Sequence, residues 1–274
     1  MSADRPATTR PAGTRPITSW VLSEQRRPLA LWTLAVCAVA AMYISFYPSI
    51  GGAELDDLVA NLPEGVVTAL GYDQIGTAAG YLSSTVYGLL GPALLLVFAV
   101  QRGSGLVAGE EEAGTLELEL TAPVGRGQVL LGRLAAIWIA LAGLVTALVV
   151  VTLAFVPLLE LDVRVGDVVA TGAMLLLLVG AVATVTAAAG ASTGRKGVAV
   201  GVGAGVAVLG FVLDAIGPTV DAGWMTAISP FSWYLAEEPL RNGFDPIGAA
   251  LLAGLAVAAA LVGLARYERR DLMV

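Results

Sequence analysis

The densest group of ionisable side chains lies in residues 109–120, GEEEAGTLELEL, which hold five glutamates: Glu110, Glu111, Glu112, Glu117 and Glu119. Carboxylates of this density can bind a metal ion, pair with a basic surface or remain in solvent. The chain has no histidine and one cysteine, so imidazole and thiolate metal sites are nearly excluded. On charge alone, the glutamate run is typical of a solvated loop.

A second group of reactive side chains consists of hydroxyls in GYLSSTVYGLLGP, which begins at Gly80. Tyr81, Ser84 and Tyr87 are three residues apart, so they share one face of a helix. Such a face could line a pathway for a substrate. It could equally hydrogen-bond to neighbouring helices, and the sequence leaves both alternatives open.

A third pattern is a strip of small residues in GVAVGVGAGVAVLG. Gly197, Gly201 and Gly205 recur every four residues and lie on one helix face. Strips of this kind let two helices approach closely. The spacing fits packing within one chain and contact between two protomers equally well.

The elements that carry these groups are long apolar segments. The chain is 57% hydrophobic and 14% charged, against about 25% charged residues in soluble domains. Six segments approach the roughly 20 residues that cross a hydrocarbon core, and backbone groups in that core require helices. The predicted spans are Pro28–Pro48, Ala78–Val100, Leu134–Val156, Val168–Ser192, Val198–Leu213 and Pro246–Ala265.

These spans predict an all-α, polytopic membrane protein. Residues 1–16 are rich in Pro, Thr and Arg and are expected to form a disordered tail. Residues 17–27 place Ile17, Trp20 and Val21 on one side of a short helix, which we expect at the membrane interface. Residues 17–274 are therefore predicted to form a single transmembrane domain.

The basic residues predict the orientation. Every Lys and Arg except Arg164 and Arg241 falls in the N-terminal tail, the second or fourth connection, or the C-terminal end. The positive-inside rule places those segments, and both termini, in the cytoplasm. In the last outer connection, Trp233 and Tyr234 are typical of anchors at the headgroup level, a role favoured over substrate binding.

Several function classes are disfavoured by what the spans lack. No ionisable residue lies in the middle of a span, whereas ion-coupled carriers usually need one there. The chain has no HExxH motif and no GxxxxGK[ST] loop, so we expect no catalytic residue and no nucleotide bound by this chain. The net charge of −7 argues against nucleic acid as a partner.

The loop between the second and third spans is similar to the signature loop of permease subunits of type-2 ATP-binding-cassette (ABC) exporters. The resemblance is carried by GEEEAGTLELELTAPVGRGQVLLGR, residues 109–133. The ending ARYERRDLMV and the segment SPFSWYLAEEPLRNG also resemble the family. The positions that match the family's inner loop are Glu110, Glu111, Glu112, Gly114, Thr115, Leu116, Glu117, Leu120, Pro123, Arg126 and Arg133.

The resemblance implies a division of labour. A separate cytoplasmic ATPase subunit, present in two copies, would bind ATP and Mg. This chain and a second, identical or homologous permease would form the pathway in the plasma membrane. Residues 110–126 would include a coupling helix that contacts the ATPase. The period-2 pattern of residues 115–120 nominally indicates a strand, but Thr115 as N-cap and Pro123 after the end favour a helix.

Two other functions remain open at this point. The chain could be a non-transporting membrane anchor or assembly protein of a multiprotein complex. It could also be a small secondary carrier, which the charge-free spans disfavour.

Overall fold

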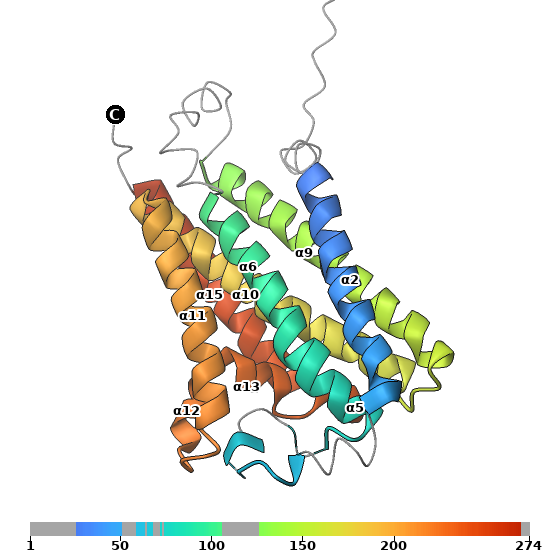
Figure 1. Ribbon diagram of the computed structural model, residues 1–274. Helices are drawn as coiled ribbons and strands as arrows, with labels where there is room; N and C mark the ends of the chain where they lie inside the picture. Colours follow the sequence, from blue (N-terminus) through green and yellow to red (C-terminus); the bar gives the residue numbers. More distant parts are fainter. Residues whose placement is uncertain are drawn as a thin grey trace, which may run out of the picture.

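The described part of the computed structural model is helical throughout and contains no strand (Figure 1). The described residues are 26–50, 59–63, 65–67, 72, 74–105 and 126–269. The helices are α2 (Arg26–Ile50), α5 (Ala78–Tyr81), the π-helix η1 (Leu82–Leu90), α6 (Gly91–Ser104), α9 (Arg126–Leu158), α10 (Val165–Thr193), α11 (Lys196–Ile216), α12 (Gly223–Ile228), α13 (Pro230–Leu235), α14 (Pro239–Asn242) and α15 (Pro246–Arg269).

Six helical segments are long and apolar enough to cross a membrane, which confirms the all-α, six-span prediction. Helix α5, η1 and α6 together form the second of these segments. The helices extend past the apolar segments, and the largest difference is in α9, which begins at Arg126 instead of Leu134. A helix can continue beyond the hydrocarbon core, where hydropathy no longer reports it.

Local sequence explains where several helices begin and end. Helix α10 ends at Gly194, which adopts the left-handed conformation (φ 67°) and donates its N–H to the carbonyl of Gly190. Helix α13 begins behind Ser229, whose hydroxyl accepts from the N–H groups of Phe231 and Ser232. The carboxylate of Asp245 accepts from the first N–H groups of α15 in the same way.

Helix α10 is the centre of the bundle. It packs against α6, α9, α11 and α15, and its side chains are buried on all sides over most of its length. Glycines provide the close approaches. A Cβ on Gly180 would overlap the ring of Trp138 on α9, and one on Gly263 of α15 would lie 2.9 Å from the backbone of Ala188. The core therefore depends on small residues at helix crossings.

The two ends of the bundle are formed by different elements. Helices α2 and α9 begin, and α6 and α15 end, at one end, which we call the terminal end (Figure 1). The short helices α12, α13 and α14 lie at the opposite, distal end. The beginning of the first span and the end of the last therefore lie at the same end of the bundle, as an even number of spans requires.

Three predicted features lie outside the described residues. They are the tail of residues 1–16, nearly all of the interfacial helix of residues 17–27, and the coupling segment up to Pro123.

Candidate functional site

The predicted coupling segment is flanked by two helices at the terminal end. Helix α6 ends at Ser104 and α9 begins at Arg126, whereas Glu110, Glu111, Glu112, Gly114, Thr115, Leu116, Glu117, Leu120 and Pro123 lie outside the described residues. Near the start of α9, a Cβ on Gly127 would lie 2.8 Å from the Leu264 side chain and 3.0 Å from the Glu268 carboxylate. The beginning of α9 is therefore packed on the end of α15.

Two arginines lie in the helices beside this segment. Arg133 on α9 is 1% exposed. The Arg102 guanidinium on α6 lies 5.6 Å from the centre of the Phe98 ring, and its Nε is buried without a hydrogen-bond partner among the described residues. Arg133 is buried and Arg102 is half-buried, and they belong to the two helices that flank the coupling segment in the chain.

The hydroxyls of Tyr81, Ser84 and Tyr87 are bonded to three different elements. Tyr81 is buried and donates to the carbonyl of Tyr43 on α2 at 2.9 Å. Ser84 donates to the carbonyl of Gly80 in its own helix at 2.8 Å. Tyr87 is fully buried and donates to Thr152 Oγ1 on α9 at 3.0 Å. These contacts join the second span to α2 and α9, and a role in lining a pathway stays a prediction.

The side chain of Tyr234 is buried inside the protein and is not free to contact lipid headgroups, so that part of the anchoring prediction is wrong. Its side chain is 1% exposed, and its hydroxyl donates to the carbonyl of Tyr87 at 3.0 Å. Burial raises the pKa of the Tyr234 phenol well above its usual value, so the group stays protonated and acts as a donor. Trp233, its neighbour, is half-buried and donates to the carbonyl of Ala227 at 2.9 Å.

The reason for the Tyr234 contact lies in the π-helix. The N–H of Gly91 bonds to the carbonyl of Val86, five residues earlier. The next residue, Pro92, has no N–H, so this pattern leaves the carbonyl of Tyr87 without a donor from its own helix. An unpaired carbonyl inside a membrane costs several kcal/mol, and Tyr234 supplies the missing donor. Pro92 within a span was the signal that could have indicated such a partner.

The glycine strip of α11 faces away from the rest of the described chain. A Cβ on Gly197, Gly201 or Gly205 would meet no described atom within 4 Å. Helix α11 instead packs through Ala199, Gly203 and Gly210, which are its buried residues. Packing within the described chain therefore uses a different face of α11 from the one that carries the strip.

An apolar groove of about 560 Å³ runs between the second span and α11. Leu89, Leu96 and Val97 line one side, and Val200 and Phe211 the other. Gln101, Ser104 and Lys196 are the polar residues along it, and all three belong to the terminal ends of their helices. No sequence pattern indicated this groove, because its two walls are about 100 residues apart in the chain.

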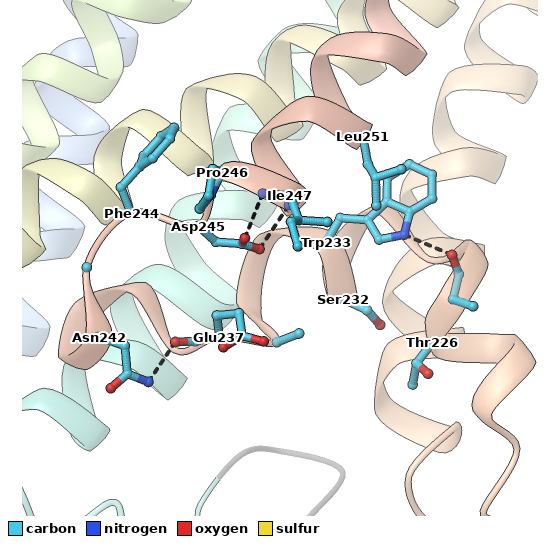
Figure 2. Close-up of a pocket in the computed structure, with 14 residues that line it drawn as sticks. Thr226, Ser232, Trp233, Glu237, Asn242, Phe244, Asp245, Pro246, Ile247 and Leu251 are labelled. Atoms are coloured by element: carbon cyan, nitrogen blue, oxygen red, sulfur yellow. Dashed lines mark hydrogen bonds between the residues drawn. The ribbon is translucent and has the colours of Figure 1, made fainter.

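A second cavity of about 560 Å³, the distal cavity, lies between α12, α13 and the start of α15 (Figure 2). Trp233, Phe244, Pro246, Ile247 and Leu251 form its apolar part. Its charged residues are Glu237 and Asp245, and none of the described lysines or arginines lines it. The Asp245 carboxylate is engaged by the N–H groups of Ile247 and Gly248, each at 2.9 Å.

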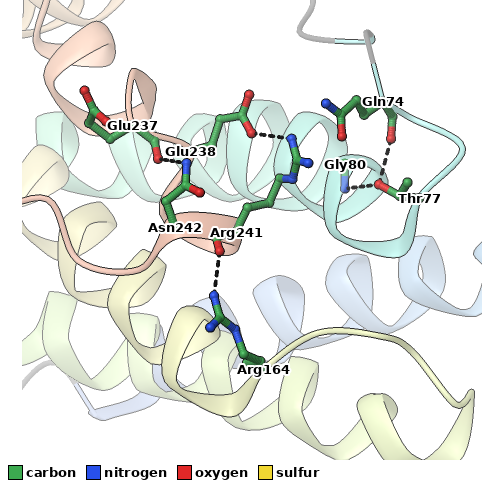
Figure 3. A network of polar contacts seen from close by, with 8 residues as sticks. All are labelled: Gln74, Thr77, Gly80, Arg164, Glu237, Glu238, Arg241 and Asn242. Atoms are coloured by element: carbon green, nitrogen blue, oxygen red, sulfur yellow. Dashed lines mark hydrogen bonds and ion pairs between the residues drawn. The ribbon is translucent and has the colours of Figure 1, made fainter.

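A polar network supports α14 beside this cavity (Figure 3). The Arg241 guanidinium pairs with the Glu238 carboxylate at 2.7 Å, and Arg164 donates to the carbonyl of Arg241 at 2.7 Å. The Asn242 amide donates to the carbonyl of Glu237 at 2.8 Å. Arg164 and Arg241, the two basic residues that depart from the charge bias, are therefore engaged in fixing the distal end.

Within the described ranges, no group of three or more acidic or cysteine side chains is close enough to hold a metal ion. The described residues offer apolar cavities and buried hydroxyls, which suit binding and movement of a ligand.

The comparisons with known proteins identify the family. The family described as "ABC-2 family transporter protein" matches residues 22–272, which is nearly the whole chain. A search of the curated proteins found no match. Because the match covers all six spans and the segment between the second and third, the chain belongs to the ABC-2 transporter family and is a multi-pass membrane permease.

Proposed function

We propose that this chain is the transmembrane subunit of an ATP-driven ABC export system. The observation that carries the proposal is the family match over residues 22–272 together with six helices long enough to span a membrane. A separate cytoplasmic ATPase, in two copies, binds ATP and Mg and hydrolyses the nucleotide. This chain and a second, identical or homologous permease form the pathway, and cargo moves outward.

The proposed site of coupling is the segment Glu110–Arg126. Its flanking helices α6 and α9 meet at the terminal end, which carries most of the chain's basic residues. The positive-inside rule supports placing this end, with both termini, in the cytoplasm and the permease in the plasma membrane. There the glutamates are within reach of an ATPase that this chain does not encode.

The proposed pathway uses the groove between the second span and α11. Its apolar walls suit apolar or amphipathic cargo, which charge-free spans also favour. The open face of Gly197, Gly201 and Gly205 on α11 supports a close contact with the second permease.

The first test is whether the purified chain brings an ATPase with it. The chain is expected to copurify with a protein that carries a GxxxxGK[ST] motif and hydrolyses ATP faster in the complex than alone. A chain that never associates with an ATPase, or never changes its rate, would favour the alternative of a non-transporting membrane anchor.

The second test addresses the coupling segment. Glu110→Lys, Glu111→Lys and Glu117→Lys, combined in one chain, are expected to loosen the ATPase or uncouple hydrolysis while the six spans remain inserted. The control is Asp4→Lys with Glu24→Lys, which reverses charge in the segment before the first span. If copurification and the ATPase rate are unchanged in the triple variant, the glutamates belong to a solvated loop and have no role in coupling.

A further inference from the structure

The distal cavity combines three features that select for one kind of ligand. It is concave, its walls are apolar and partly aromatic, and the charged residues that line it within the described part of the chain are acidic. A volume of about 560 Å³ falls within the range of small-molecule sites, which is about 300–1,000 Å³.

The acidic residues at the cavity differ in whether their carboxylates already have partners. Asp245 caps α15 with both oxygens, and Glu238, which lies beside the cavity, pairs with Arg241 (Figures 2 and 3). The Glu237 carboxylate has no hydrogen bond or ion pair with any described residue, and only its backbone carbonyl is engaged, by Asn242. Glu237 therefore provides an uncompensated negative charge at the cavity.

The aromatic residues favour the same sign of charge in a ligand. The Trp233 indole is fixed by its bond to the carbonyl of Ala227, so the ring does not have to be ordered when a ligand binds. Phe244 lies on the rim and is 52% exposed. Faces of Trp and Phe rings attract cations, and quaternary ammonium groups are the usual ligands of such sites.

We propose that the distal cavity binds an organic cation with an apolar chain, with Glu237 and Trp233 holding the cationic group and Ile247 and Leu251 contacting the chain. A zwitterionic lipid headgroup is disfavoured, because its phosphate would be repelled by Glu237 and Asp245. The occupant is therefore a soluble amphiphile with a net positive charge. This site is separate from the groove along α11, and the proposal does not rest on transport, because binding is measured without an ATPase.

The test is calorimetric titration of the full chain in an uncharged maltoside detergent with hexyltrimethylammonium. Hexanesulfonate, which has the same chain length and the opposite charge, is the matched ligand. We expect saturable binding of the cation, no binding of the anion, and weaker binding of the cation as salt screens the carboxylate.

Variants identify the site. Glu237→Gln is expected to raise the Kd of the cation roughly fivefold, as befits a partly exposed ion pair. Glu160→Gln removes the same charge from the turn after α9, outside the cavity lining, and is expected to leave the Kd unchanged. Trp233→Leu is expected to raise the Kd about threefold, and Trp233→Phe less, because Phe keeps an aromatic face.

Three results would overturn the proposal. The first is equal binding of cation and anion, and the second is an equal effect of Glu237→Gln and Glu160→Gln. The third is competition by phosphatidylethanolamine: if nanodiscs containing this lipid weaken cation binding in the wild type but not in Glu237→Gln, the occupant is a lipid ammonium group instead.

Discussion

Helices α10 and α11 are both long, apolar, glycine-containing spans, but α10 lies at the centre of the bundle and α11 lies at its edge. Helix α10 contacts four other spans and buries residues on every side. Helix α11 buries only Ala199, Gly203 and Gly210 among its described residues. Glycine in α10 admits a neighbouring helix, whereas most glycines in α11 face open space.

The comparison shows that a glycine in a span does not by itself indicate a contact with another helix. Gly180 on α10 makes room for Trp138, and Gly203 on α11 makes room for Thr186 of α10. Gly201, only two residues from Gly203, meets nothing within 4 Å. The rotation of each helix about its axis decides which glycines contact a neighbouring helix, and a regular spacing of glycines does not reveal that rotation.

The largest expected effect is that of Gly180→Val, matched with Gly205→Val. The new side chain on α10 would overlap the Trp138 ring, and we expect a loss of stability on the order of 4 kcal/mol or more. Gly205→Val adds the same atoms in open space and is expected to leave stability unchanged. Unfolding in mixed detergent–dodecyl sulfate micelles, followed by circular dichroism, measures both, and similar losses would contradict the difference between the helices.

A smaller effect is expected when a leucine is truncated. Leu178 on α10 is 0% exposed, and Leu209 on α11 is 62% exposed. Leu178→Ala leaves a cavity and is expected to cost about 2–3 kcal/mol, while Leu209→Ala exchanges one apolar surface for another in contact with lipid. The same unfolding assay measures both variants. If Leu209→Ala lowers the free energy of unfolding by more than half as much as Leu178→Ala does, another part of the protein covers this face of α11.

The third prediction compares two glycines on the same helix, α11. Gly203→Ala places a methyl group against Thr186 and is expected to cost about 1–2 kcal/mol. Gly201→Ala on the same helix is expected to be neutral or slightly stabilising, because alanine is the better helix former. Thermal unfolding of the two purified variants tests this, and the reverse order would show that α11 is rotated about its axis.

The smallest effect is that of a hydrogen bond which joins α10 to α9. The Trp138 indole donates to Thr184 Oγ1 at 3.2 Å, and Thr184→Val removes the acceptor. Hydrogen bonds between spans contribute about 0.6 kcal/mol on average, so we expect a loss of that order. Thr171→Val, which loses only the bond to the carbonyl of Asp167 within α10, is the control; an equal loss there would show that the bond between helices contributes nothing specific.

Much of the fold could be predicted because lipid imposes one simple rule on each span. Apolar length identified six helices, and Asp245 and Gly194 mark helix ends by ordinary capping. The arrangement of the spans could not be predicted, because lipid and a protein core are equally apolar. The centrality of α10 follows from contacts between distant segments, such as Gly263 with Ala188.

The candidate sites were less accessible to sequence reasoning. The spacing of Tyr81 and Tyr87 indicates a shared polar face, but their partners Tyr43 and Thr152 lie on other helices and share no motif with them. Tyr234 was misassigned because a tyrosine beside a tryptophan near a span end is typical of an anchor. The groove joins walls that are about 100 residues apart in the chain, so only the folded structure brings them together. The distal cavity is lined by residues 226–251 alone, but its shape depends on how α12, α13 and the start of α15 pack against one another.

The π-helix of the second span also sets an angular offset within that span. Bonds to the fifth preceding residue put more residues into each turn than an α-helix does, so α6 is rotated about its axis relative to α5. Tyr81 fixes the beginning of this segment to α2, and Tyr234 fixes its middle to α13. A change of Leu82–Leu90 to an α-helix would therefore rotate α6 relative to α5 and reshape the wall that α6 contributes to the groove.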